Sequence, residues 1–501
     1  MNISGLKYII AYSFLTGMLL SVSSLYAQQS EKFSILVTGN TNRALNDSSL
    51  FFEWQKQLEI SNNSACLFTG NVINDKGNLE LPIENNKDPK SPILIAPGEA
   101  EWSNGSNRGK EFLIQLESDL SGKSKEPVYF PEAACPGPKE IVLNEQLIVI
   151  LLDTYWWVHK FDRRFNKCDI ESQADILMQI EDAIRRNYSS KHIVLAGNHT
   201  LKSYGNTSGY FSLKQWLFEA PKTFFRKFPG TKSDIQYPDF KEFRNDVLSI
   251  LKKYPDVIYV SGGESNLQYF QHGRTHFVVS GSWSNQEYVR KSLPEFGASE
   301  NGFARLDFKT DGDCFLTFFS SKKVLFRKLI YHKKLLALAQ KPIEPNSLPD
   351  SIIATASYRY NISPSKYKWL GKNYRNIWET PVKFPVFDIE NKNGGLKVVK
   401  RGGGQQTYSL RLENASGNQF VLRSIDKYVE GALPRELQNT FAVDIVQDQI
   451  SASNPYAAPV VASLAQFAQV LHTHPEIFYV PDDSRFGIYR QDVANKLFLF
   501  E

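Results

Sequence analysis

This chain has few cysteines, a small net charge and few long apolar segments. Its 501 residues include 4 cysteines, and 58 basic against 53 acidic residues give a formal net charge of +5. The spacing of the cysteines fits no metal-binding motif. The charge balance gives no reason to expect a nucleic-acid partner. Beyond the N-terminal region, no apolar segment is long enough to span a membrane.

Several catalytic motifs are also missing from the sequence. There is no Gly-x-Ser-x-Gly elbow, no lysine-containing phosphate-binding loop and no cysteine–histidine constellation, so the corresponding enzyme classes are excluded. The scattered histidines lie beside or within strand-like segments and are interpreted as structural or exposed residues rather than ligands: His192, His272, His276, His472 and His474.

The chain is long enough for at least two domains. Domains commonly have about 100–200 residues, so 501 residues exceed one ordinary core. Hydrophobic residues make up 42% and charged residues 22% of the chain. These fractions are typical of globular proteins, so disorder is not expected.

The N-terminal segment predicts export. Lys7 is the only charged residue before residue 31, an apolar run extends from Tyr8 to Leu20, and small or polar residues lead to Ala27. This pattern is typical of a secretory signal peptide over residues 1–27. The alternative is an uncleaved anchor, although the run is shorter than the ~20 residues of a usual span. We expect a periplasmic, outer-membrane-associated or cell-surface protein, with no transmembrane span after cleavage.

An oxidising compartment permits disulfides. Cys135 and Cys168 both lie in loop-like sequence, and we expect them to pair. Cys66 lies within an apolar, strand-like run and is expected to be a buried thiol.

Residues 31–320 have the pattern of a layered α/β domain. An amphipathic helix is predicted over Ile170–Ile184, and short apolar runs between turn-rich clusters indicate buried strands. The predicted strands are Phe33–Val37, Cys66–Phe68, Ile93–Ile95, Leu147–Leu152, Ile193–Leu195, Val257–Val260 and His276–Val279. In such sheets the functional residues follow the carboxyl ends of the strands.

Two further regions follow this domain. Residues 321–390 are predicted to form a basic amphipathic helix and a proline-punctuated linker; the helix face is either solvated or in contact with an anionic surface. Residues 391–501 are predicted to form a small α+β domain. It has a glycine-rich hairpin at residues 402–404, a helical block over 434–470 and a final strand at 496–500.

Five strand-end loops carry glycines at matching places. They contain Gly39-Asn40, Gly70-Asn71, Gly98-Glu99-Ala100-Glu101, Gly197-Asn198-His199 and Gly262-Gly263-Glu264-Ser265. In order and spacing they resemble the calcineurin-like metallophosphoesterases over about residues 33–320. The resemblance implies a four-layer αββα sandwich and, in an active member, hydrolysis by two metal ions.

The chain departs from that family in all five loops. Asn40 and Asn71 stand where the family has metal-binding aspartates, and Glu99 with Ala100 replaces its Asn-His pair. Asn198 stands where the family has a histidine ligand, and Gly263 and Ser265 stand where it has two more histidines. Two dications about 3.5–4 Å apart need bridging anionic ligands, which neutral amides do not supply. We therefore expect no metal pair and no other cofactor.

The polar residues that remain have two interpretations. In the first, the asparagines serve only as turn residues, because Asn tolerates left-handed backbone. Alternatively, the loops form a converted pocket that binds a polar ligand. Its candidate residues are Asn40, Asn71, Glu99, Glu101, Asn198, His199 and Glu264. A single hard cation held by the three glutamates is a further alternative, since Ca²⁺ accepts oxygen ligands alone.

The C-terminal domain offers two weaker resemblances. Residues 433–456 resemble a domain that follows phosphoesterase-like modules in large Gram-negative envelope proteins, where an outer-membrane barrel comes next. An envelope protein or outer-membrane barrel is thus the expected partner, and a natural continuation beyond Glu501 is left open. The glycines at 402–404, with Arg423 and Lys427, are loosely similar to the phosphate-covering loop of kinase-like folds, although a simple hairpin explains them equally well.

The sequence therefore predicts a non-catalytic exported envelope protein that uses a degenerate phosphoesterase scaffold for binding or assembly. The alternative is a divergent calcineurin-like hydrolase with an altered metal site. A nucleotide-binding C-terminal domain is a third hypothesis.

Overall fold

The computed structural model describes most of the chain, which divides into two compact units, Met1–Leu338 and Ala339–Glu501. The described residues are 32–42, 48–61, 63–74, 91–123, 127–131, 134–161, 168, 170, 172–335, 348–402, 406–429, 432–433, 437 and 440–501. The predicted signal peptide, residues 1–27, lies outside them. Within the described residues, no helix combines the length and the apolar character needed to cross a bilayer.

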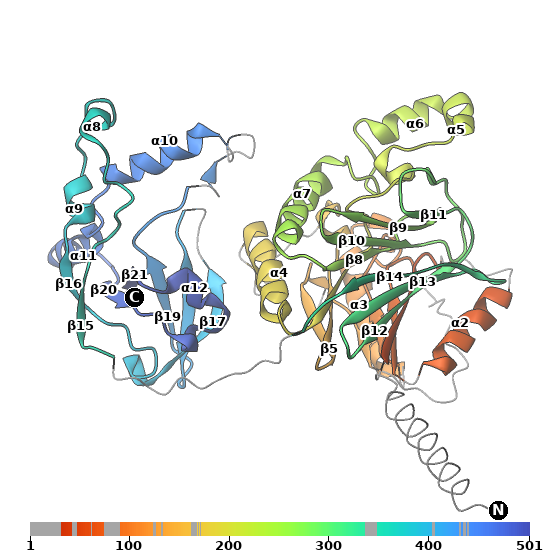
Figure 1. Ribbon diagram of the computed structural model, residues 1–501, viewed down its shortest axis with the longest axis horizontal. Coiled ribbons are helices and arrows are strands. Elements are labelled where there is room, and N and C mark those ends of the chain that lie inside the picture. Colours follow the sequence, from red (N-terminus) through yellow and green to blue (C-terminus); the bar gives the residue numbers. More distant parts are fainter. Residues whose placement is uncertain are drawn as a thin grey trace, which may run out of the picture. The chain divides into compact units, whose positions relative to one another are not determined.

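The first unit contains two seven-stranded mixed sheets (Figure 1). The first sheet has the order β14 (Val324–His332), β13 (Asp313–Phe319), β12 (Phe303–Lys309), β1 (Lys32–Thr38), β2 (Ser64–Phe68), β3 (Ile93–Ile95), β4 (Val128–Tyr129). Strands β1 to β4 are parallel, and β12 to β14 continue the sheet in antiparallel fashion.

The second sheet is built in a similar way. Its order is β11 (Phe296–Ala298), β9 (Leu267–His272), β10 (Thr275–Ser280), β8 (Ile258–Ser261), β7 (His192–Ala196), β6 (Leu147–Leu151), β5 (Lys139–Asn144). Strands β6, β7, β8 and β10 are parallel and form its centre. The carboxyl ends of these strands lie at one edge of the sheet, where the candidate loops begin.

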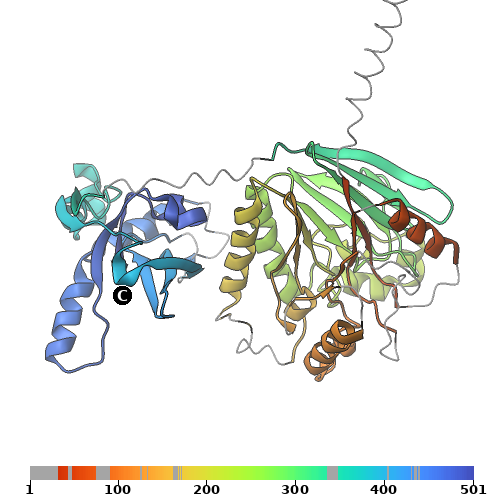
Figure 2. The same ribbon diagram turned by 90° about the horizontal axis from the view of Figure 1, so that it is seen from below.

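Alternation along the strands shows how the layers pack. In β1, Ile35 and Val37 join the core between the two sheets, whereas Leu36 joins the core beneath the helices. The helices that cover the outer faces are α2 (Ser48–Ile60), α3 (Gly109–Lys123), α4 (Gln173–Asn187) and α7 (Pro238–Lys253), with α4 and α7 side by side (Figure 2). A strand side chain alternates between faces, so this burial defines an αββα arrangement. The predicted fold class is confirmed.

The strands predicted in residues 31–320 are all present, and the predicted helix over Ile170–Ile184 is α4. This helix begins three residues later than predicted because Ser172 and Asp175 form a capping box. Cys66 is buried and reduced, and Cys135 and Cys168 form a disulfide.

The predicted basic helix after residue 321 is wrong. Residues Val324–His332 form strand β14, which pairs with β13 along its length. Ile330 and Tyr331 face the core between the sheets, while Arg327 and Lys328 are exposed. The mixture of apolar and basic residues here is compatible with the period of a helix and with that of a strand. Pairing with β13 in the folded protein selects the strand.

The second unit starts before the predicted boundary at residue 391. Part of the predicted linker forms β15 (Ser351–Ala354), α8 (Pro364–Leu370), α9 (Arg375–Glu379) and β16 (Val382–Pro385). The buried Arg375 guanidinium binds both Asp448 oxygens, at 2.8 and 2.6 Å, and so joins α9 to α10 (Phe441–Gln449).

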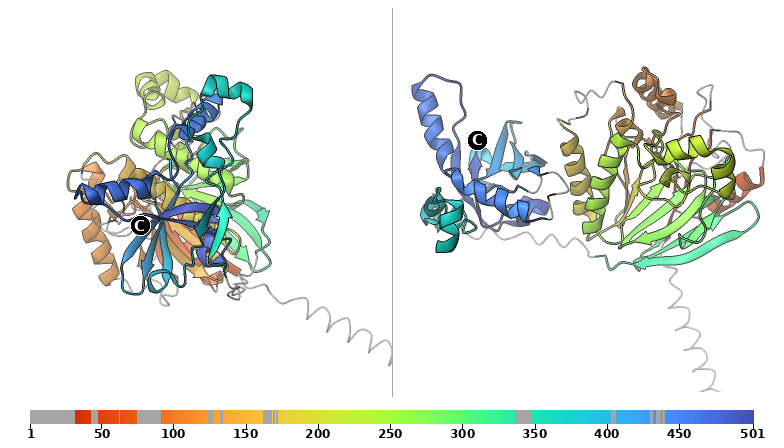
Figure 3. Two further views of the ribbon diagram at one scale, coloured as in Figure 1. Left: turned by 90° about the vertical axis from the view of Figure 1, so that its left-hand side faces the viewer. Right: turned by 90° about the horizontal axis from the view of Figure 1, so that it is seen from above.

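The main sheet of this unit is antiparallel. Its order is β17 (Leu396–Gly402), β18 (Ser409–Asn414), β19 (Gln419–Ser424), β21 (Lys496–Phe500), β20 (Glu476–Val480). Gly402 pairs with Ser409, so β17 and β18 form the predicted hairpin, and Gly403 and Gly404 lie outside the described residues. Helices α10 and α11 (Ala457–Phe467) lie outside the sheet (Figure 3), and α12 (Arg490–Val493) precedes β21.

Removing the disulfide should destabilise the first unit. The bond joins residues separated by 33 positions, and closing a loop of this size contributes about 2–4 kcal/mol. We expect the double variant Cys135→Ser/Cys168→Ser to unfold at lower urea concentration than the unaltered protein. Added reductant should destabilise the unaltered protein and leave the double variant unchanged; equal sensitivity of both proteins would contradict the prediction.

Candidate functional site

The five candidate loops meet at one end of the sandwich through asparagine side chains. They follow β1, β2, β3, β7 and β8, which come from both sheets. The hydrogen bonds of Asn40, Asn71 and Asn198 cross from one loop to another, and we call these three residues the amide centre.

Asn40 joins the first loop to the fifth. Its Nδ2 donates to the carbonyl oxygens of Gly262 and Gly281, both at 2.9 Å, and lies 3.1 Å from the Ser265 hydroxyl. Two carbonyl acceptors require the nitrogen of the amide at this position. An aspartate could not replace it, because its carboxylate would face the same two carbonyl oxygens.

Asn71 extends this network to the second and third loops. Its Nδ2 donates to Asn40 Oδ1 at 2.8 Å, and its Oδ1 accepts from the backbone N–H of Ala100 at 3.0 Å. Asn40 and Asn71 both have positive φ, 55° and 56°. Asparagine adopts this left-handed backbone more readily than most residues, so Asn40 and Asn71 are turn residues that also bond to neighbouring loops.

Asn198 closes the centre from the fourth loop. Its Nδ2 donates to the Thr69 carbonyl at 2.7 Å. A Cβ placed on Gly70 would lie 2.4 Å from this Nδ2, and one placed on Gly98 would lie 2.8 Å from it. The glycines therefore allow the loop backbones to approach the amide closely. Within the centre, Asn71 bonds directly to Asn40, and Asn198 bonds to the backbone of the second loop.

Glu101 stabilises the loops that carry the amide centre. Its carboxylate is fully buried and accepts backbone N–H groups from Asn71 at 2.8 Å, Val72 at 2.7 Å and Gly98 at 2.8 Å. These bonds fix the second and third loops against each other. Glu99, by contrast, is half-buried and accepts from the Tyr155 hydroxyl at 3.3 Å.

Glu264 lies in a different set of contacts. It is fully buried, and it accepts from the Ser203 hydroxyl, from Thr207 N–H at 2.9 Å and from Gln268 Nε2 at 3.0 Å. Burial raises the pKa of Glu264 to about 7, because the charged form loses its hydration. Two of these partners, Ser203 and Thr207, belong to the segment that follows β7, Gln268 belongs to β9, and none belongs to the amide centre.

His199 is held in one neutral form. Its Nε2 lies 2.9 Å from the Lys232 carbonyl, so this nitrogen carries the proton. Its Nδ1 therefore accepts, at 3.0 Å, from the Thr154 hydroxyl. Burial lowers the pKa of His199 to about 4. Because both ring nitrogens are engaged, the imidazole is a structural link between the fourth loop and residue 232.

Asp153 is a buried acid that the loop comparison did not select. It follows β6 and accepts from Trp102 Nε1 at 2.8 Å and from Trp156 N–H at 3.0 Å. Burial raises the pKa of Asp153 to about 7. The signal in the sequence was an aspartate directly after a buried parallel strand.

The candidate residues thus divide into separate groups. Asn40, Asn71, Asn198 and Glu101 share one hydrogen-bonded centre, whereas His199 and Glu264 hold the two ends of the segment between β7 and α7. Glu99 contacts Tyr155 at the edge. Within the described ranges, no three His, Cys, Asp or Glu residues are grouped so that they could hold a metal ion.

Comparison with known proteins gives likeness only at the level of overall structure. No family model matches the chain, and no curated protein matches it. Among solved structures, GAP50, described as the anchor in the inner membrane complex of Plasmodium, aligns at 13% identity and a TM-score of 0.41 over 61% of this chain and 90% of its own.

Two enzymes are similar to the chain at comparable identity. Purple acid phosphatase PPD1 of yellow lupin (Lupinus luteus) aligns at 14% identity and a TM-score of 0.39, over 60% of this chain and 53% of its own. The NAD nucleotidase NadN of Haemophilus influenzae aligns at 12% identity and a TM-score of 0.26, over 59% and 49%. Because these TM-scores are low, the evidence for the two-sheet architecture is the strand order of this chain and not the comparisons.

Replacing Asn40 by aspartate should destabilise the first unit. The variant loses the bonds from Nδ2 and places a carboxylate against two carbonyl oxygens, which costs about 2–4 kcal/mol for a buried group. Urea unfolding of Asn40→Asp measures this loss. Asn393→Asp is the matched control, because Asn393 is exposed and also has positive φ, at 51°. Equal stability of the two variants would contradict the assigned network.

The stability of the first unit should carry a pH-dependent contribution from Glu264. Between pH 4.5 and about 7 the folded state keeps a proton that the unfolded chain has released, so the free energy of unfolding falls as pH rises. The contribution reaches at most about 3 kcal/mol. In Glu264→Gln it is absent.

Urea titrations of this variant and the unaltered protein at a series of pH values provide the measurement. The stability of Glu264→Gln relative to the unaltered protein should increase through the window and then level off. Glu59→Gln, at an exposed position on α2, is the control. A pH-independent difference for Glu264→Gln would show that Glu264 is ionised throughout.

Proposed function

We propose that this protein is a non-catalytic component of the cell envelope, in which the first unit is a phosphoesterase-like scaffold used for binding or assembly. The observation that carries the proposal is the amide centre. At the loop positions where the resembling family places metal ligands, Asn40, Asn71 and Asn198 bond to neighbouring loops.

The direction of these bonds supports the loss of two-metal chemistry. A cation needs oxygen or nitrogen lone pairs directed at it. Asn40 and Asn198 instead use their N–H groups to bind backbone carbonyl oxygens. Asn71 Nδ2 binds Asn40 Oδ1, and Asn71 Oδ1 accepts from Ala100 N–H. Rotating the amides to present their oxygens would break these bonds and leave buried carbonyls without donors, which is costly. The amides therefore perform the mechanical role that bridging ions would otherwise have.

Export to an oxidising compartment is part of the same proposal. The pattern of Lys7 followed by a short apolar run and a small-residue cleavage site supports it. The Cys135–Cys168 disulfide supports it independently, because such bonds persist mainly outside the cytosol.

An envelope protein, such as an outer-membrane barrel, is the proposed partner of the second unit. Support comes from α11, where Val460, Val461, Leu464 and Phe467 are exposed. The segment 457–471 contains no charged residue. Clustered apolar side chains on a surface are typical of protein–protein contacts.

Metal analysis combined with a generic phosphoester assay tests the proposed loss of catalysis. We expect purified protein, incubated with Mn²⁺ or Zn²⁺ and then desalted, to retain no stoichiometric metal and to give no turnover above the buffer rate. Asn71→Ala should behave identically in both measurements.

The alternative, a divergent hydrolase, predicts the opposite result. It requires two retained transition-metal ions per chain and phosphoester turnover, with both lost in Asn71→Ala and kept in the exposed control Asn393→Ala. That result would reverse the proposal.

A further inference from the structure

A pair of short helices presents an unusual surface on the first unit. Helices α5 (Leu213–Phe218) and α6 (Ala220–Lys227) form a helical hairpin that projects beyond the two sheets (Figure 1). Phe218 is 79% and Leu213 75% exposed. Trp216, Leu217, Phe224, Phe225 and Phe228 are also exposed. Seven large apolar side chains thus face solvent within sixteen consecutive positions, far more than isolated surface residues would explain.

The hairpin is fixed firmly at its base. Arg226 binds the fully buried Asp234 carboxylate at 2.7 Å, and Thr231 donates to the same carboxylate through N–H and hydroxyl, at 2.8 and 2.7 Å. The buried Thr223 hydroxyl donates to the Gln215 carbonyl at 3.3 Å, which joins the two helices. The exposed apolar surface is therefore held in place by a polar core.

The two ends of the hairpin segment are tied to the converted loops. Glu264 accepts from Thr207 N–H on the entering side, and His199 donates to the Lys232 carbonyl on the leaving side. The acid and the imidazole that remain in the loops therefore position this hairpin.

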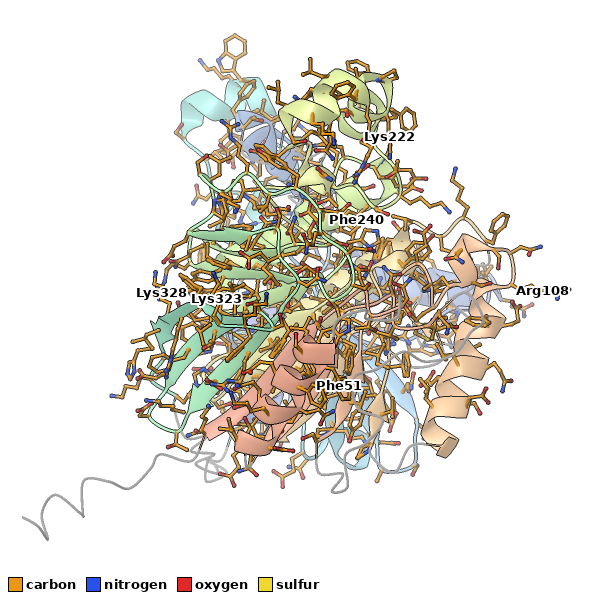
Figure 4. All side chains as sticks on the ribbon, turned by 90° about the vertical axis from the view of Figure 1, so that its right-hand side faces the viewer. Phe51, Arg108, Lys222, Phe240, Lys323 and Lys328 are labelled. Carbon is orange, nitrogen blue, oxygen red and sulfur yellow. A yellow bond between two sulfur atoms is a disulfide. The ribbon has the colours of Figure 1, made fainter. Side chains whose placement is uncertain are left out.

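Basic residues are interleaved with the apolar ones. Residues 211–234 contain five basic side chains, Lys214, Lys222, Arg226, Lys227 and Lys232, and two acidic ones, Glu219 and Asp234. Asp234 pairs with Arg226 and Glu219 lies 3.5 Å from Lys222, which leaves Lys214, Lys227 and Lys232 as the excess of positive charge. The Lys227 ammonium lies 5.7 Å from the ring centres of both Trp216 and Phe228. Figure 4 shows Lys222 on the hairpin, away from Phe240 in the body of the unit.

We infer that the α5–α6 hairpin docks on the surface of a lipid bilayer that contains anionic lipids. Helices with Trp, Phe and Leu on one side and Lys or Arg around them are typical of segments that lie in the interface of a membrane. The apolar rings enter the boundary between headgroups and chains, and lysines extend to the lipid phosphates. Helices of six and eight residues are too short to span a bilayer.

Charge is what favours a lipid surface over a protein partner or a second copy of this chain. The core of a protein interface is depleted of lysine, whereas lysines near an anionic bilayer each contribute about 1 kcal/mol, or roughly a fivefold change in binding. A second copy would present the same excess of positive charge and would be repelled. This inference goes beyond the proposed function, since it concerns a different surface and holds whether or not the loops bind metal.

Vesicle co-sedimentation of the full chain tests the inference. One set of vesicles contains phosphatidylcholine alone, and the other contains equal parts of phosphatidylcholine and phosphatidylglycerol. The apolar variant is Trp216→Ser/Phe224→Ser/Phe225→Ser. Its matched control is Phe52→Ser/Trp369→Ser, which removes aromatic side chains that are 67% and 89% exposed elsewhere.

We expect binding to the anionic vesicles to fall at least about tenfold in the apolar variant, because each aromatic ring loses its transfer into the apolar phase. The control should bind like the unaltered protein. All proteins carry the same N-terminal segment, so binding through that segment would leave the apolar variant unchanged and would overturn the inference. Unchanged circular dichroism and melting temperature show that each variant is folded.

A second variant tests the charge. Lys222→Glu/Lys227→Glu should weaken binding to anionic vesicles at least about tenfold, and added salt should weaken binding of the unaltered protein. Lys252→Glu, at an exposed position on α7, is the control.

Equal binding to both vesicle types, or binding to neither, would overturn the inference. So would self-association in the absence of lipid that the apolar variant abolishes, because the hairpin would then be an interface between copies.

Discussion

Side-chain amides that donate to backbone carbonyl groups hold the first unit together at the end where its two sheets meet. Parallel strands from both sheets direct their carboxyl ends, and therefore their loops, toward the same region. Buried carbonyl groups there need donors. Asn40 and Asn198 supply them, Asn71 donates to the side chain of Asn40, and Glu101 accepts backbone N–H groups of the second and third loops. The loops at this end of the first unit are therefore bonded to one another through side-chain amides and one buried carboxylate.

The sequence was sufficient to predict the layered sandwich and the convergence of the loops. Buried strands give short apolar runs, and glycine marks each place where loop backbones approach closely. It did not separate Glu264 and His199 from the amide centre, because their partners Thr207 and Lys232 lie in a segment without a recognisable motif. The prediction of a helix at β14 was also wrong. The mixture of apolar and basic residues there is compatible with a helical period, and only the pairing with β13 identifies a strand.

Two buried ionisable residues connect the strand-end loops to the exposed α5–α6 hairpin. Glu264 and His199 are both buried, and each uses its polar atoms to fix one end of the segment that carries α5 and α6. These two side chains therefore act as supports for the α5–α6 hairpin. The strand-end geometry that gathers functional residues in α/β folds thus positions an exposed apolar hairpin in this chain.

Strand β14 forms one edge of the first sheet, and among the described residues no further strand of that sheet pairs with its outer side. Such an edge invites a strand from another molecule to add to the sheet, the step that begins many aggregates. Here Arg327 and Lys328 are exposed on the strand, and Lys322 and Lys323 precede it. Two copies approaching edge to edge would bring Lys322, Lys323 and Arg327 of each copy together, and their repulsion opposes such pairing.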